Sequence, residues 1–167
     1  MDNLDTTSGA ADFDFIIGSW QVRHRRLTKR MVGCSEWIEF DGTSTTRKIL
    51  GGCGNVEDND IALPDGAYRA AAFRSFDTTT GNWSIWWLDG RNPQHLDTPV
   101  VGRFEAGTGR FFARDSFDGT PILVRFLWLP LDSRTARWEQ AFSADDGCSW
   151  ETNWTMDFKR VPEAKPA

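Results

Sequence analysis

The sequence predicts a single all-β domain, a closed antiparallel up-and-down β-barrel of about ten strands. Short apolar and β-branched runs recur along its 167 residues with turn residues between them, and no stretch keeps the 3.6-residue apolar period of a helix. The chain also has the length of one domain. A barrel leaves no strand edge exposed, and this number of strands leaves interior room for a small ligand. We therefore expect a barrel with a cavity.

Ten segments carry strand patterns. In chain order they are 18–27, 35–40, 44–50, 68–76, 82–89, 100–105, 110–117, 122–129, 135–142 and 150–159. Asp-Gly pairs and glycine-rich links supply the positive φ of tight hairpins, and Asp41-Gly42 is interpreted as one of these turns. Residues 51–67 and 90–99 are expected to be irregular. Residues 1–11 and 162–167 are expected to be flexible tails around a barrel domain of residues 12–161.

The charge and the cysteine content exclude several classes of function. With 24 acidic against 19 basic side chains the net charge is −5, which disfavours nucleic acid as a partner. No apolar run is long enough to span a membrane. The three cysteines lack metal-ligand spacing, the start of the chain lacks a signal-peptide pattern, and two histidines cannot make a His-rich metal site. We expect a cytoplasmic protein without a metal or other cofactor.

Aromatic residues dominate the apolar content, with nine Trp and twelve Phe against one Tyr. Side chains alternate between the two faces of a strand. Trp138, Gln140 and Phe142 therefore share one face, and Thr152 and Trp154 share another with further aromatics. Both are interpreted as inward stripes. Gln140 and Thr152 would then be polar handles inside an aromatic cavity.

The first strand carries the strongest functional signal. Trp20, His24 and Arg26 lie on the same face of an alternating strand. If Trp20 points inward, His24 and Arg26 do so as well. A buried His beside an Arg is costly unless an acceptor or a ligand anion is close. The alternative is that carboxylates or water at the barrel mouth satisfy both groups.

Strand alternation leaves the direction of other candidates open. Trp37 with Glu39, and Trp87 on its own strand, can face either side. Arg125 lies within an otherwise apolar strand, so it either snorkels outward or reaches inward to hold a carboxylate. Residues 143–150 match the Asp-box hairpin pattern Ser-x-Asp-x-Gly-x-x-Trp, to which we assign a structural role.

The opening of the first strand carries a family resemblance. Gly18-Ser19-Trp20 resembles the Gly-x-Trp start of lipocalins and other calycin barrels. Together with residues 143–154 and 156–160, the chain resembles an uncharacterised bacterial family of small calycin-like barrels, which implies the fold but no activity. It is distantly similar to the nitrobindins, which bind haem through a histidine on the last strand. That strand has no histidine here, so the resemblance does not extend to haem binding.

These observations leave three functions open. The favoured one is binding of a small, partly apolar molecule, aromatic or acyl, in an aromatic-lined cavity. Its candidate contacts are His24, Arg26, Trp37, Glu39, Trp87, Arg125, Trp138, Gln140, Thr152 and Trp154. The first alternative is a metal-independent isomerase, lyase or cyclase that uses His24 as its acid–base group, oriented by Glu39, Asp89 or Asp115. The second is a solid barrel with a structural or interaction role.

Overall fold

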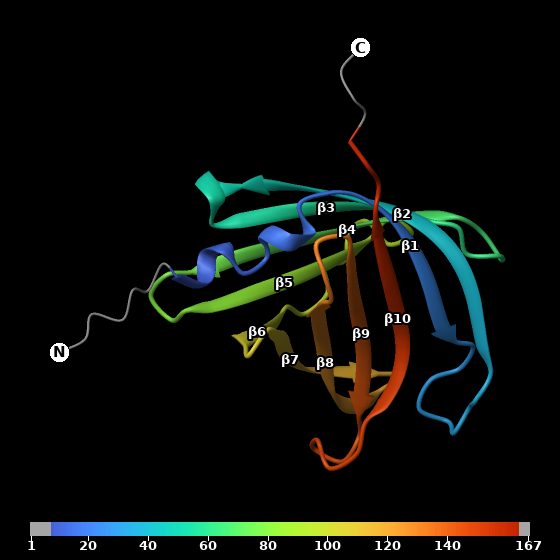
Figure 1. The fold of residues 1–167 in the computed structure, drawn as a ribbon. Coiled ribbons are helices and arrows are strands. Elements are labelled where there is room, and N and C mark those ends of the chain that lie inside the picture. The colour runs from blue at the N-terminus through green and yellow to red at the C-terminus, as the bar shows by residue number, and fades with distance from the viewer. Residues whose placement is uncertain (1–7, 164–167) are drawn as a thin grey trace.

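Ten antiparallel strands close into one barrel in the computed structural model, which describes residues 8–163 (Figure 1). The strands are β1 (Gly18–Leu27), β2 (Trp37–Ile49), β3 (Gly54–Ile61), β4 (Tyr68–Asp77), β5 (Asn82–Asp89), β6 (Val100–Glu105), β7 (Thr108–Phe117), β8 (Thr120–Pro130), β9 (Thr135–Ser143) and β10 (Glu151–Arg160). Each strand pairs with its neighbour in sequence, and β1 pairs with β10 to close the ring. The predicted up-and-down barrel is confirmed.

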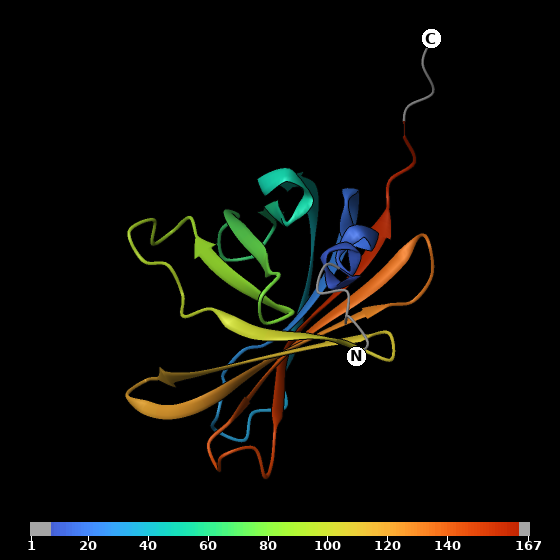
Figure 2. The same ribbon diagram turned by 90° about the vertical axis from the view of Figure 1, so that its left-hand side faces the viewer.

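An N-terminal segment of two 3-10 turns plugs one end of the barrel. These are η1 (Ser8–Ala11) and η2 (Asp14–Ile16), and they lie within the ring of strand ends in Figure 2. The indole of Trp20 donates to Ile16 O at 2.9 Å, and that of Trp83 donates to Gly9 O at 3.0 Å. Residues 8–11, which the sequence assigned to a tail, are therefore part of the plug. Residues 1–7 and 164–167 lie outside the described part.

The expected strands at 35–40 and 44–50 are one continuous strand, β2, so the interpretation of Asp41-Gly42 as a turn was wrong. Gly42 pairs with Val22 on one side and with Ile61 on the other. A Cβ on Gly42 would lie 2.5 Å from Asp60 O and 2.9 Å from His24 Nε2. The glycine is needed for this close approach of strands and not for a turn.

The region expected to be irregular at 51–67 contains β3. This strand was missed because its inward side chains are polar. Asn55, Glu57 and Asn59 alternate with outward residues and are each 2% exposed, so a search for apolar alternation does not detect them. The prediction divided β2 into two strands and missed β3, so the two errors cancel in the predicted number of strands. The remaining helical turn is η3 (Leu50–Gly52), and no helix within residues 8–163 is long and apolar enough to cross a membrane.

Candidate functional site

A cavity of about 450 Å³ opens at the end of the barrel opposite the plug. The ends of β1, β4, β5, β7, β8, β9 and β10 contribute to it. Its wall is aromatic and consists of Trp87, Phe117, Phe126, Trp138, Phe142 and Trp154. The rings of Trp87 and Trp138 each pack edge-on against Trp154, at centroid separations of 5.8 and 5.3 Å. This size and lining are typical of small-molecule sites.

Two guanidinium groups lie at the mouth of this cavity. Arg26 donates to the Tyr68 hydroxyl at 3.3 Å and stacks on Trp154, with 4.6 Å from its guanidinium carbon to the ring centroid. Arg30 stacks on Phe142, and its Nη2 is buried without a hydrogen-bond partner among the described residues. Neither group forms an ion pair within residues 8–163. Stacking fixes both side chains while their N–H donors remain available for a ligand.

The same two arginines also line an outer groove. This groove has a volume of about 560 Å³ and shares Arg26, Arg30 and Phe117 with the cavity. Lys29 and Arg91 also line it, together with the carboxylates of Asp65 and Asp118. Burial, together with the charge of Arg26, lowers the pKa of Arg30 to about 10, so Arg30 still carries its charge at neutral pH. An anion would therefore meet two charged guanidinium groups, Arg26 and Arg30, where the groove and the cavity share their lining.

Acidic side chains occupy another part of the cavity rim. Asp89 is held by Arg91 at 2.7 Å, and this hydrogen bond keeps the pKa of Asp89 below its usual range. Asp97 and Asp115 also line the cavity. Burial raises the pKa of Asp97, and the neighbouring charge of Asp115 adds to that rise. No cluster of three or more His, Cys, Asp or Glu in residues 8–163 has the arrangement of a metal site.

His24 points into the barrel but does not line the cavity. It is 1% exposed, its ring stacks on Phe40 at 4.8 Å, and its Nδ1 accepts a hydrogen bond from the Trp154 indole at 3.1 Å. Burial, with a contribution from the charge of Arg26, lowers the pKa of His24 to about 4. None of Glu39, Asp89 or Asp115 forms a hydrogen bond or ion pair with it. A buried imidazole of low basicity with one nitrogen occupied is poorly suited to general-base catalysis.

Gln140 is the polar group of the aromatic stripe, as the alternation of β9 predicts. It is 9% exposed and lines the cavity. Its amide nitrogen donates to Asn153 Oδ1 at 2.9 Å. Asn153 was not among the predicted site residues. It reaches the interior because β10 has an irregularity between Thr152 and Trp154, which turns two consecutive residues inward.

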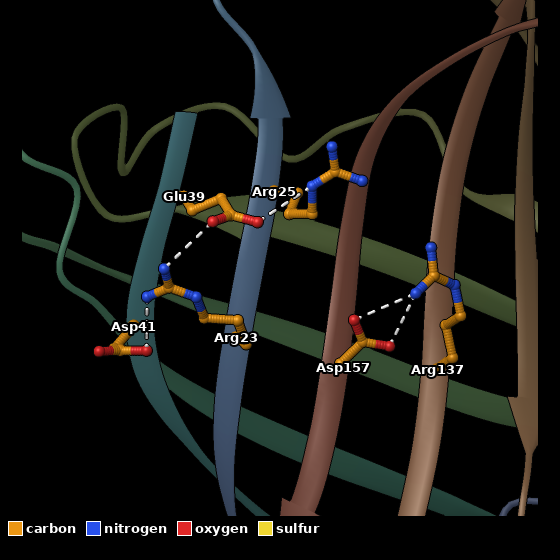
Figure 3. A network of polar contacts seen from close by, with 6 residues as sticks. All are labelled: Arg23, Arg25, Glu39, Asp41, Arg137 and Asp157. Carbon is orange, nitrogen blue, oxygen red and sulfur yellow. Dashed lines mark hydrogen bonds and ion pairs between the residues drawn. The ribbon is translucent and has the colours of Figure 1, made fainter. Parts of the chain in front are cut away.

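Besides His24, four of the ten predicted contacts lie outside the cavity. Two of them, Trp37 and Glu39, are on β2. Trp37 is covered by Arg25, whose guanidinium carbon lies 4.9 Å from the ring centroid. Glu39 forms ion pairs with Arg23 at 3.4 Å and Arg25 at 3.2 Å on the outer surface (Figure 3). The outward direction follows from Phe40 and His24 being paired on the inner face.

Arg125 and Thr152 are the other two. Arg125 stacks on Trp150, with 4.6 Å to the ring centroid, while its sequence neighbours Val124 and Phe126 line the cavity. An arginine between two inward residues of a strand must face outward. Thr152 pairs with Ala141 before the β10 irregularity, so the face it was predicted to share with Trp154 is interrupted. The inward stripe therefore starts at residue 153.

Arg30 is the main cavity residue that the sequence did not reveal. It follows β1 in a loop, where strand alternation gives no direction. The basic residues between positions 23 and 30 are divided between two sides of the barrel wall. Arg23 and Arg25 point outward, whereas Arg26 and Arg30 line the cavity. The only sign in the sequence that a basic residue of this stretch points inward was that Arg26 shares a face with Trp20.

Comparison with known proteins supports the fold. The structure is similar to that of an S-type phycobiliprotein lyase, CPES, from Guillardia theta, with a TM-score of 0.62, 7% sequence identity and coverage of 98% of this chain and 99% of that one. The barrel is therefore of the lipocalin-like type. No family model matches the sequence, and no curated protein matches it.

Proposed function

We propose that this barrel binds a small, partly apolar molecule that carries a carboxylate or another anionic group. The observation that carries the proposal is the pair of guanidinium groups, Arg26 and Arg30, held without a carboxylate partner beside a tryptophan-lined cavity. Two close cations repel each other, and an anion between them would remove that repulsion. A flat or acyl body would pack against Trp87, Trp138 and Trp154.

Binding accounts for this interior better than the alternatives. A cavity of about 450 Å³ argues against a solid barrel, and the buried, weakly basic His24 argues against an acid–base enzyme built on that residue. One similar solved structure is that of a phycobiliprotein lyase, at a sequence identity that supports the fold alone. It is a reason to include an open-chain tetrapyrrole among the ligands tested.

The test compares ligands of one shape with and without the anion. Retinoic acid and retinol form one such pair, and laurate and lauryl alcohol form another; biliverdin, a flavonoid and haem extend the panel. Affinities are measured by isothermal titration calorimetry and by tryptophan fluorescence. We expect the acids to bind about 10- to 100-fold more tightly than the alcohols, which is the range for hydrogen bonds to charged groups.

Matched variants locate the anion. Arg26→Met and Arg30→Met each keep a long apolar side chain and remove the charge, so the preference for the acid should fall. Arg125→Met is the control because Arg125 stacks on Trp150 on the outer face. If no ligand of any class binds, the proposed function is wrong. If acids and alcohols bind equally, the cavity binds apolar molecules but the arginines are not an anion site.

A further inference from the structure

The inner faces of β2, β3 and β4 carry a polar stripe where a barrel core is normally apolar. Its members are Ser44, Thr46, Asn55, Glu57, Asn59 and Arg74, all 2% exposed or less. Such groups are costly inside a protein unless each polar atom has a partner. The stripe faces the aromatic side chains of β8 and β9 across the barrel, and it is separate from the arginines at the mouth.

An ion pair between Arg74 and Glu57 is the centre of the stripe. Arg74 Nη2 contacts Glu57 Oε2, and Arg74 Nη1 donates to Asn55 Oδ1 at 2.8 Å. The rings of Phe13 and Trp128 each lie 5.1 Å from the guanidinium carbon, so the charged group is enclosed by aromatic rings. A buried ion pair is favourable only when its remaining donors and acceptors are also satisfied.

Two N–H donors next to this ion pair have no partner. They are Arg74 Nε and Trp128 Nε1, both fully enclosed and unpaired among residues 8–163. Both side chains line a small cavity of about 20 Å³ together with Glu57. This volume suffices for one water molecule, which needs roughly 10–15 Å³ of such space and two to four polar partners. The cavity therefore has the size and the donors for one oxygen atom.

The small cavity adjoins the cavity at the mouth. Trp87, Phe126 and Trp138 line both spaces, so the small cavity lies directly beside the larger one. Ala72 of β4 lies on the small cavity, and Tyr68, four residues earlier on the same strand, accepts the hydrogen bond from Arg26 at the mouth. At about 3.3 Å per residue, four residues of strand span about 13 Å. An extended twelve-carbon acid covers a similar length.

We infer that the small cavity is an inner subsite for a hydrogen-bond acceptor, and that it extends the ligand site proposed above. In the free protein it holds one water bound by Arg74 Nε–H and Trp128 Nε1–H. In the complex, a carbonyl or hydroxyl oxygen at the far end of the ligand replaces that water while the anionic end remains at Arg26 and Arg30. The preferred ligand class is thus an acyl chain with an anion at one end and an oxygen at the other.

The experiment compares laurate with ω-hydroxylaurate by calorimetry. We expect the hydroxy acid to bind the unmodified protein about three- to tenfold more tightly, as one or two hydrogen bonds would give. Trp128→Phe keeps an aromatic ring and removes the donor, so the ratio of the two affinities should fall toward one. Ala72→Val fills the small cavity with methyl groups and should have the same effect on the ratio. Ala71→Val, on the outer face of the same strand, is the control and should keep it.

A high-resolution crystal structure of the ligand-free protein is the second measurement. It should contain one water within hydrogen-bond distance of both donors. Equal affinities of the two acids, in a protein whose laurate binding depends on Arg26, would overturn the inner subsite and leave the proposed function intact. If neither acid binds, the proposed binding of acyl ligands fails and the crystal structure decides the subsite: an empty cavity overturns it, and an ordered water on both donors supports it.

Discussion

The indole nitrogen of Trp154 donates a hydrogen bond of 3.1 Å to Nδ1 of His24 inside the barrel. This bond requires an unprotonated Nδ1, so it selects the neutral imidazole with its hydrogen on Nε2. Phe40 stacks on the same ring at an interplanar angle of 11°. His24 therefore fixes the position of a cavity wall, because Trp154 lines the cavity and His24 does not. Its effect on ligand binding would act through Trp154.

The buried state of His24 predicts a specific acid sensitivity. The unfolded chain takes up a proton at the ordinary histidine pKa near 6.5, whereas the folded protein takes it up only near pH 4. The stabilisation is therefore complete above pH 6.5 and is lost progressively as the pH falls to 4. Over that window the free energy of unfolding should drop by about 3 kcal/mol from this group.

Urea unfolding at a series of pH values measures this loss, with His24→Asn as the reference. The Asn side-chain oxygen can accept the Trp154 hydrogen bond but does not titrate. Subtracting the curve of the variant removes the contributions of the carboxylates. The difference between the two free energies of unfolding should change with pH only between pH 4 and 6.5. Two parallel curves would show that His24 does not resist protonation.

The plug end should depend strongly on Trp20. This residue is 1% exposed, packs edge-on against Phe158 at 6.1 Å, and donates to Ile16 O. Trp20→Ala should lower the free energy of unfolding by about 3–5 kcal/mol, as truncation of large aromatic core residues does. Trp20→Phe, which keeps most of the ring and loses the hydrogen bond, should cost less. A loss below about 1 kcal/mol in urea unfolding of Trp20→Ala would show that the plug is not required for stability.

The sequence was sufficient for the barrel because most strands alternate apolar and polar residues. It failed where the interior is polar. Asn55 of β3 pairs with Arg74, Glu57 forms an ion pair with it, and the inward residues of β3 from 55 to 59 have no apolar signature. The ion pair of Glu57 and Arg74 forms because β3 and β4 are neighbours in the barrel, and no local sequence pattern in either strand predicts it.

The site was predictable only to the extent that strand alternation was unbroken. Alternation from Trp20 placed Arg26 on the inner face, and alternation along β9 placed Trp138 and Gln140 there. It could not decide the direction of Glu39 or Arg125, whose strands carry large side chains on both faces. The irregularity in β10 has no glycine or proline to mark it, and one extra residue there is enough to turn Thr152 outward.

The hairpin between β9 and β10 should contribute to stability and not to ligand binding. Asp145 accepts hydrogen bonds from Ser149 N and from the hydroxyls of Ser143 and Ser149, and these bonds lower the pKa of Asp145 to about 2. Asp145→Ala removes all of them, so the thermal midpoint should fall. Asp146→Asn, which removes an exposed pair with Arg114 and keeps a side chain that tolerates the positive φ of 56° at this position, is the matched control. A variant of Asp145 with normal stability and lost ligand affinity would reverse the assignment.

Gly42 should be irreplaceable although it lies in the middle of a strand. Gly42→Ala places a Cβ 2.5 Å from Asp60 O, a backbone atom of the paired strand, and 2.9 Å from His24 Nε2. Replacing a glycine usually stabilises by about 0.4–1 kcal/mol through the unfolded chain, so the clash must exceed this gain. We expect a net loss of about 1–3 kcal/mol, the range for overpacked cores.

Thr43→Ala on the exposed face of the same strand is the control, and urea unfolding compares the two variants. The clash with His24 also predicts a second effect. Displacing the imidazole would lengthen its bond to Trp154, so the tryptophan fluorescence of the folded Gly42→Ala protein should change as well. Had Asp41-Gly42 been a hairpin turn, the tryptophan signal would be unaffected. A variant with the stability and spectrum of Thr43→Ala would therefore contradict the close approach of β2 to His24.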